Sequence, residues 1–132
     1  MACLDTTVFI DLSRSRSKHR AGIISLLADL PASAVTTRFN VAELLLGVEL
    51  AREPIAERQQ VDDALAGILI LEFDEAAALQ YAKISAYVRR LGRPVADMDR
   101  LIAAVVLANA EVLVTRNPKH FADIPGLVIM SY

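Results

Sequence analysis

The chain of 132 residues has little of what several common protein chemistries require. A single cysteine, Cys3, can form neither an internal disulfide nor the paired-cysteine zinc site of a structural metal domain. The two histidines lie far apart and form no zinc-protease motif. The five glycines match neither a dinucleotide-binding fingerprint nor a P-loop, and no serine nucleophile elbow occurs. Zinc, nucleotide-cofactor and serine-nucleophile chemistries are therefore poorly supported.

Long hydrophobic runs and an excess of one charge are also missing. The longest apolar run, residues 101–108, is far too short to span a bilayer, and Asp5 interrupts any signal-peptide core at the N-terminus. The chain has 14 Lys and Arg against 16 Asp and Glu, which gives a net charge of −2. A protein that coats nucleic acid by charge alone is strongly basic. We therefore expect a cytosolic protein with no membrane partner, in which cations could still gather around one site.

The composition is typical of one packed domain. Apolar residues make up 55% of the chain and charged residues 23%, which excludes a disordered tail. No linker, repeat or low-complexity segment divides the sequence, and its length is close to that of one ordinary domain. We expect a single domain over residues 1–132.

Short apolar segments alternate with longer helical patterns along the chain. This alternation is typical of an α/β fold with a mostly parallel sheet, in which ligands bind beyond the carboxyl ends of the strands. The expected strands are residues 2–4, 34–36, 68–71, 112–115 and 127–129. The expected helices are about residues 6–13, 19–30, 38–52, 55–66, 75–91 and 98–110.

Acidic side chains occur where these elements meet. Asp5 directly follows the first strand, Glu43 lies in the first turns of the third helix, and Asp99 begins the helix before the strongest strand. Asn117 follows two residues after that strand. Carboxylates at such positions can converge at the carboxyl edge of a parallel sheet, and several carboxylate oxygens together suit Mg²⁺ or Mn²⁺.

Each of these residues also has an ordinary structural interpretation. Asp5 alone suits a turn or a helix N-cap, and Asn117 before a proline suits a turn. Glu43 is harder to explain in this way, because its neighbours in the sequence are nearly all apolar. Asp97 and Asp99 point about 200° apart on a regular helix, so both cannot face one metal. We expect Asp99 to face the site, with Asp97 as an N-cap or an outer, water-bridged ligand.

Three stretches together carry a resemblance to a known family. They are Leu-Asp-Thr-Thr-Val at 4–8, Val-Ala-Glu-Leu at 41–44 with Gly47, and Asp-Arg-Leu-Ile-Ala-Ala at 99–104 followed by Leu-Val-Thr-Arg-Asn at 113–117 and by His-Phe at 120–121. In this order the chain resembles the PIN-domain ribonucleases, and most closely the VapC-like toxins of bacterial toxin–antitoxin pairs. The resemblance covers essentially the whole chain and implies a three-layer α/β sandwich around a mostly parallel central sheet.

The resemblance also implies a divalent-metal-dependent endoribonuclease. Asp5, Glu43 and Asp99 match the acidic metal-site positions of the family. Asn117 matches a fourth position that is often Asp and often Asn, where a water-mediated contact with the metal is the expectation. Three carboxylates and one Mg²⁺ leave a charge of −1, so charge counting favours a second ion that arrives with the RNA.

Further residues and partners follow from the same resemblance. Thr6 and Thr115 match hydroxyl positions near the pocket, although turn and strand-end hydrogen bonding would explain them nearly as well. The family implies a protein antitoxin, a tRNA, rRNA or mRNA substrate, and a homodimer with possible contact faces at residues 44–50 and 77–91. Cations that could hold the RNA backbone are Arg116, the favoured one by its position, with Arg14, Arg16, Lys18 and Lys119.

Three other interpretations are possible. A non-catalytic PIN-like module that binds nucleic acid or protein predicts that Asp5→Asn leaves function intact. A Mg²⁺ phosphatase would need a second Asp two residues after Asp5, where this chain has Thr7. A phospho-receiver domain would need a lysine after a late strand, and Lys119 lies off the expected turn.

Overall fold

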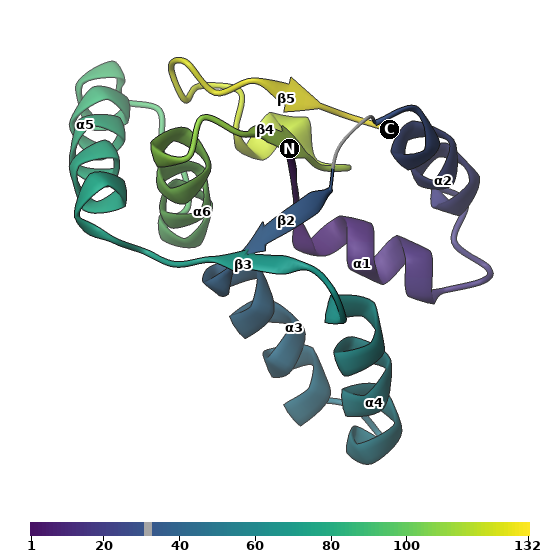
Figure 1. Ribbon diagram of the computed structural model, residues 1–132. Helices are drawn as coiled ribbons and strands as arrows, with labels where there is room; N and C mark the ends of the chain where they lie inside the picture. The colour runs from purple at the N-terminus through teal and green to yellow at the C-terminus, as the bar shows by residue number, and fades with distance from the viewer. Residues whose placement is uncertain (31–32) are drawn as a thin grey trace.

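Five short apolar segments form one sheet in which every neighbouring pair of strands is parallel. The computed structural model describes residues 1–30 and 33–132. The strand order is β3-β2-β1-β4-β5, so β1 and β4, distant in sequence, are neighbours (Figure 1). The strands are β1 (Ala2–Leu4), β2 (Ala34–Thr37), β3 (Leu69–Leu71), β4 (Val112–Val114) and β5 (Ile129–Met130).

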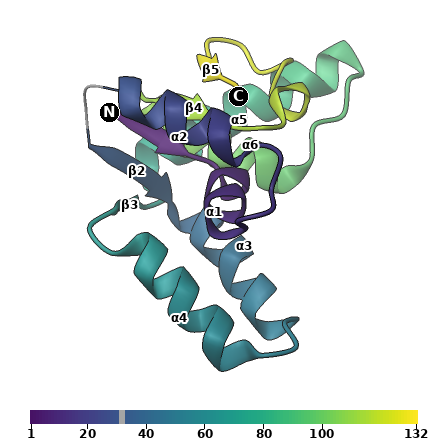
Figure 2. The ribbon, with the colours of Figure 1, turned by 90° about the vertical axis from the view of Figure 1, so that its right-hand side faces the viewer.

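Helices cover both faces of this sheet, which confirms the predicted α/β sandwich. They are α1 (Thr6–Ser13), α2 (Arg20–Asp29), α3 (Arg38–Glu49), α4 (Pro54–Leu65), α5 (Glu75–Leu91) and α6 (Asp97–Ala108), with the short 3₁₀ helix η1 (Pro118–His120) after β4. The α3 and α4 helices pack on each other as a hairpin that projects away from the sheet (Figure 2).

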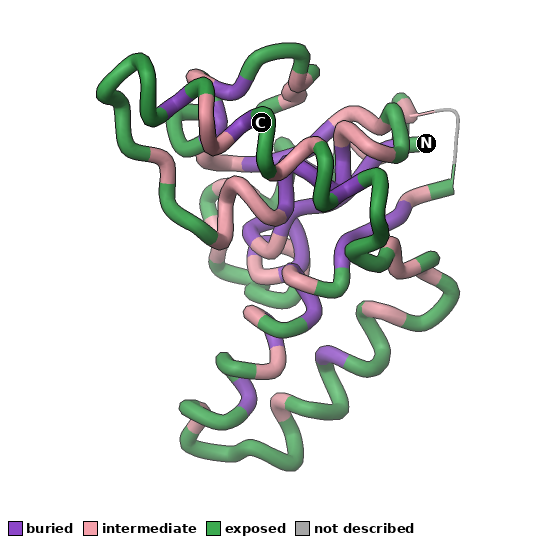
Figure 3. The backbone as a smooth tube through the Cα atoms, turned by 90° about the vertical axis from the view of Figure 1, so that its left-hand side faces the viewer, coloured by how far each residue is buried: buried purple, intermediate pink, exposed green. Residues whose placement is uncertain are grey.

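The alternation of side chains along β1 divides the core into two halves. Cys3 faces the side covered by α5 and α6, where it packs in one buried cluster with Ile84 and Ile102. Ala2 and Leu4 face the opposite side, where the buried cluster includes residues of α1, α2, α3 and α4. The central strands β1 and β4 are therefore largely buried, and this explains why these two strands are continuously apolar, whereas β2 ends in two threonines. Figure 3 shows the buried residues in purple through the middle of the molecule.

Several helix ends lie where the sequence predicts them, whereas one helix end and one strand lie elsewhere. The Asp74 side chain accepts a hydrogen bond from the Ala77 backbone N–H at the start of α5, and Gly92 ends that helix in the left-handed conformation with φ 67°. The third helix stops at Glu49 rather than near residue 52. The last strand lies at Ile129–Met130 rather than at 127–129, because its pairing with β4 sets the register.

The helices of residues 1–30 and 33–132 include none that combines the length and the apolar character needed to cross a membrane.

Candidate active site

The end of β1 places Asp5 at the carboxyl edge of the sheet, beside the end of β4. The Asp5 backbone N–H donates to the Val114 carbonyl (2.9 Å), which ties the two strand ends together. Asp5 is the N-cap residue of α1, yet its side chain makes no capping hydrogen bond. Its carboxylate, in a residue only 6% exposed, instead accepts hydrogen bonds from Asn40 Nδ2 (3.0 Å) and from the Thr115 hydroxyl (2.7 Å). Capping therefore does not explain this side chain.

Asn40 connects Asp5 to Glu43. The Asn40 Nδ2 that binds Asp5 also donates to Thr6 Oγ1 (3.1 Å), and the Thr6 hydroxyl donates to Glu43 Oε1 (2.7 Å). The amide oxygen of Asn40 accepts from the Thr37 hydroxyl (2.7 Å) in a capping box that begins α3. Asn40 is fully buried, whereas Thr6 and Glu43 at the other end of this network are only partly buried. The sequence analysis did not identify Asn40 as a site residue, because the Thr-x-x-Asn spacing indicates a helix start but not this link.

Asp99 lies in the first turn of α6, next to a histidine that the motif alone did not explain. His120 Nδ1, at the end of η1, is 3.6 Å from Asp99 Oδ2. Burial raises the pKa of Asp99, the neighbouring His120 lowers it, and the negative charge of Asp5 raises it further. The contact with His120 places Asp99 beside the segment that follows β4, and its part in a metal site stays a prediction.

Burial and neighbouring negative charges also affect the pKa of Glu43. Desolvation raises the pKa of Glu43, the hydrogen bond from Thr6 opposes that shift, and the charges of Asp5 and Asp99 raise it again. Like charges act on one another in this way only when they share a poorly screened region. Asp5, Glu43 and Asp99 are hereafter the acidic cluster: Asn40 and Thr6 connect Asp5 to Glu43, and the negative charge of Asp99 acts on Glu43.

A divalent cation fits the chemistry of the acidic cluster. Hard cations such as Mg²⁺ prefer carboxylate oxygens, and neither Asp5 nor Glu43 is paired with a Lys or Arg of residues 1–30 and 33–132. Across these same described residues, no three His, Cys, Asp or Glu side chains are arranged to hold one ion together. The cluster therefore supplies suitable donors and uncompensated charge, while gathering the donors around one ion would require side-chain movement.

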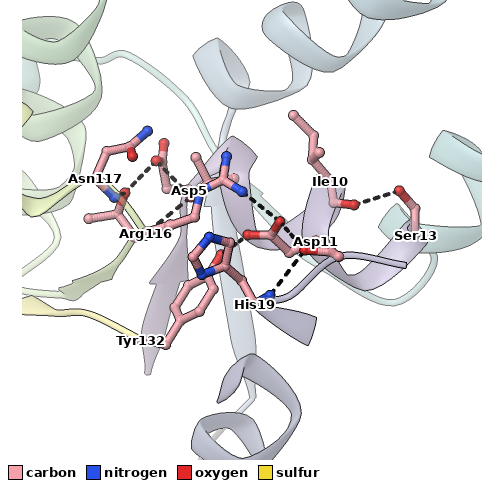
Figure 4. Close-up of polar contacts among 11 residues, drawn as sticks. Asp5, Ile10, Asp11, Ser13, His19, Arg116, Asn117 and Tyr132 are labelled. Carbon is pink, nitrogen blue, oxygen red and sulfur yellow. Dashed lines mark hydrogen bonds and ion pairs between the residues drawn. The ribbon is translucent and has the colours of Figure 1, made fainter. Parts of the chain in front are cut away.

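The segment after β4 brings Thr115 and Asn117 to the same edge. Thr115 is fully buried, and its hydroxyl donates to Asp5 while accepting a hydrogen bond from the Asn117 backbone N–H (3.0 Å). Asn117 begins η1 without a side-chain capping bond, and Figure 4 shows it beside Asp5. Both residues thus lie where the sequence placed them, although a contact of Asn117 with a metal stays a prediction.

Asp97 differs from its prediction as a helix cap. The N-cap residue of α6 is Ala96, and Asp97 is the first helical residue. Its carboxylate, 65% exposed, accepts from the Tyr81 hydroxyl (2.6 Å) and from Arg100 Nη2 (3.0 Å). Asp97 therefore binds α5 and its own helix. The N-cap interpretation was wrong because the helix begins one residue earlier than its sequence signal suggested.

Arg116 makes an ion pair that the sequence did not predict. Its Nη1 lies 2.7 Å from Oδ1 of Asp11, an α1 residue that is only 1% exposed. The side chain of Arg116 is 30% exposed, so part of the guanidinium stays accessible. A role of Arg116 in holding RNA therefore stays a prediction. One nitrogen of its guanidinium already binds Asp11.

A cavity of about 270 Å³ opens beside the acidic cluster, between α1, α3 and α4. Thr6 and Glu43 line it at the end near the sheet edge, and Gly47 lines it further along α3. Arg14, the first residue of the exposed basic loop, also lines it. The cavity therefore has in its lining both Glu43, one member of the acidic cluster, and Arg14, a cation that could meet a negatively charged ligand.

Comparisons with known proteins agree with this arrangement. The family described as PIN domain matches residues 2–127. The tRNA(fMet)-specific endonuclease VapC of Shigella flexneri is 32% identical over 116 residues, which cover 79% of this chain and 87% of that protein. The match therefore extends over most of both sequences.

Solved structures show the same fold. The DNA-bound VapBC structure from Salmonella typhimurium matches with a TM-score of 0.84 and 26% identity, covering 99% of this chain and 98% of the matched chain. VapBC-5 of Mycobacterium tuberculosis, described as a member of the VapBC family of toxin–antitoxin systems, matches with a TM-score of 0.74 and 27% identity over 98% and 95% of the two chains. By sequence and by fold, this chain belongs to the PIN domain family.

Proposed function

We propose that this chain is an endoribonuclease that requires Mg²⁺ or Mn²⁺ and acts as the toxin of a toxin–antitoxin pair. The observation that carries the proposal is the hydrogen-bond chain from Asp5 through Asn40 and Thr6 to Glu43, in a chain that matches the PIN domain over residues 2–127. The printed names of the relatives support it, since one is an endonuclease specific for tRNA(fMet) and another belongs to a family of toxin–antitoxin systems.

The residues of the chain have distinct tasks in this proposal. A bound Mg²⁺ or Mn²⁺ lowers the pKa of a water ligand and neutralises charge on the phosphoryl oxygens. Asp5, Glu43 and Asp99 would hold the cation. Asn40 and Thr115 fix the orientation of the Asp5 carboxylate through their hydrogen bonds. Such contacts keep a ligand in place before the cation arrives.

RNA would approach through the cavity beside Glu43. Arg14 lines this cavity, and Arg16 and Lys18 follow it on an exposed loop. Arginine pairs with phosphate through two parallel hydrogen bonds, and the surrounding positive charge attracts the RNA backbone. The three cations offset the repulsion that the acidic cluster alone would exert on a phosphate.

A protein antitoxin and a second copy of the chain are the expected protein partners. Leu46 on α3, Leu50 at the C-cap of α3, and Ile55 on α4 are exposed large apolar side chains on the projecting hairpin. Some of the predicted contact residues, such as Leu44 and Ile84, are buried in the core and are not available to a partner. The hairpin therefore offers apolar surface for a partner, while the homodimer stays a prediction.

Cleavage of total tRNA and rRNA by the purified chain, freed of any bound antitoxin, tests the proposal. We expect discrete cuts with Mg²⁺ or Mn²⁺, none with EDTA, and a loss of at least about a hundredfold in Asp5→Asn, because changes that only support a metal ligand already cost about 10–100-fold. The measurement is the initial rate of product formation on a denaturing gel.

Asp62→Asn is the matched control, because it removes the same charge from an exposed ion pair with Arg58 on α4. This variant should cleave at the wild-type rate. Equal cleavage by wild type and Asp5→Asn would identify a contaminating nuclease and contradict the proposal. RNA binding without any cleavage would favour the non-catalytic module.

A further inference from the structure

Arg116 lies within reach of the acidic cluster. It directly follows Thr115, whose hydroxyl binds Asp5. The Arg116 backbone N–H donates to Thr7 Oγ1 (3.1 Å), and the Thr7 hydroxyl in turn donates to Asp5 Oδ2 (3.3 Å). An arginine side chain that starts this close to the Asp5 carboxylate would be attracted to it, because the guanidinium fork matches the two oxygens of a carboxylate.

The Arg116 guanidinium instead points towards Asp11 (Figure 4). Asp11 lies one helical turn after Thr7 on α1, so the Arg116 backbone and side chain bind the same face of this helix. The Asp11 carboxylate also accepts hydrogen bonds from the Ser17 hydroxyl (2.8 Å) and from the Tyr132 hydroxyl (2.9 Å). These three donors hold a buried charge in one orientation and keep it fully compensated.

We propose that Asp11 is a positioning residue that keeps the Arg116 guanidinium out of the acidic cluster, so that a divalent cation can bind there. This inference rests on the metal requirement of the proposed function. A guanidinium and a divalent cation compete for the same carboxylates, and the ion pair with Asp11 removes the guanidinium from that competition. Without the Asp11 charge, the Arg116 guanidinium would be attracted to the Asp5 carboxylate, to which the Arg116 backbone is linked through Thr7.

A purely structural ion pair would behave differently. If Asp11 and Arg116 only tied the segment after β4 to α1, loss of either partner would loosen that segment, and Arg116→Gln alone would weaken Mn²⁺ binding because it leaves the buried Asp11 charge without its partner. If Asp11 restrains Arg116, Arg116→Gln alone leaves Mn²⁺ binding at least as tight as in wild type, and it also repairs the defect caused by removal of the Asp11 charge. The two roles therefore predict opposite results for the Arg116→Gln single variant.

Mn²⁺ binding to the full chain without RNA measures this difference directly, by electron paramagnetic resonance or calorimetry. We expect Asp11→Asn to weaken Mn²⁺ binding about tenfold or more, because a unit charge beside the site opposes a cation in a poorly solvated region. The double variant Asp11→Asn with Arg116→Gln should return to within about threefold of wild type. Asparagine has the size of aspartate and still accepts a hydrogen bond from Ser17, and circular dichroism checks that each variant is folded.

The controls separate this inference from the function on which it rests. Asp62→Asn, which removes a charge from an exposed pair, should bind Mn²⁺ as wild type does. Wild-type protein that fails to bind Mn²⁺ would overturn the metal requirement itself. Wild-type binding that Asp11→Asn leaves unchanged, or that the double variant does not recover, would overturn the role of Asp11 alone. Asp11→Ser, with the same expected result, replaces Asp11→Asn should the latter not fold.

Discussion

Replacing Asp99 with asparagine is expected to abolish cleavage and, at the same time, to stabilise the metal-free protein. Cleavage should fall by at least about a hundredfold, because Asp99 is a proposed ligand of the cation and changes that only support a ligand already cost about 10–100-fold. The gain in stability should be on the order of 1 kcal/mol, or about 3–5 °C in Tm for a domain of this length, as is common where a functional site carries unfavourable charge.

The sign of the stability change follows from the pKa of Asp99. Burial and the charge of Asp5 raise this pKa above its ordinary value of 3.8, against the opposing effect of His120. The folded state then binds more protons than the unfolded state between the two pKa values, so stability falls as the pH rises through that window. The ionised Asp99 therefore destabilises the folded state fully at neutral pH, and this destabilisation disappears when the carboxylate is protonated in acid. Asparagine has no charge to desolvate, so Asp99→Asn should be more stable at pH 7, and its advantage should shrink towards about pH 4.

Thermal melts with and without Mg²⁺ check this prediction. Wild type should gain about 2.7 kcal/mol at a cation concentration of about 100 Kd, whereas Asp99→Asn should gain much less at the same concentration. Asp62→Asn, whose carboxylate lies in an exposed pair, should melt and cleave as wild type does. A lower Tm for metal-free Asp99→Asn at pH 7, or cleavage at the wild-type rate, would contradict the assignment of Asp99.

The acidic cluster could be predicted because it depends on features that a sequence displays locally. Asp5 follows a strand, and Asp99 begins a helix that leads into another strand. A parallel sheet places all carboxyl ends at one edge, and here β1 and β4 are direct neighbours in it. The chain order of elements and the topology rules for parallel sheets therefore place Asp5 and the start of α6 at one edge, while the metal-binding role of the three acids stays a prediction.

The supporting residues could not be found in this way. Asn40 lies 35 positions from Asp5, to which its side chain donates a hydrogen bond. Arg116 lies 105 positions from Asp11, with which it forms an ion pair. No local period or spacing relates residues at such separations. At the start of α6 a local signal gave a wrong prediction. Asp is a preferred N-cap residue, but here the N-cap is Ala96, and the Asp97 carboxylate accepts hydrogen bonds from Tyr81 and Arg100.

Asn40→Ala is expected to damage both stability and cleavage, because this one side chain holds two parts of the site. Its removal leaves Asp5 Oδ1 without its buried donor and breaks the capping box with Thr37. A buried polar group without a partner costs about 1–3 kcal/mol, and a lost cap costs about 1 kcal/mol. We therefore expect a loss of about 3 kcal/mol, which for a domain of this length lowers Tm by about 10 °C.

Cleavage by Asn40→Ala should fall about 10–100-fold even well below its Tm, because Asp5 and Glu43 lose the side chain that fixes their relative orientation. Initial rates at a temperature where circular dichroism shows the variant fully folded separate this effect from unfolding. Asn109→Ala is the matched control, since the Asn109 amide donates only to the Val105 carbonyl at the end of α6. That variant should change the rate by less than about twofold. A folded Asn40→Ala protein with the wild-type rate would show that Asp5 and Glu43 do not need this link, and that their orientation is set by Thr115 and Thr6 alone.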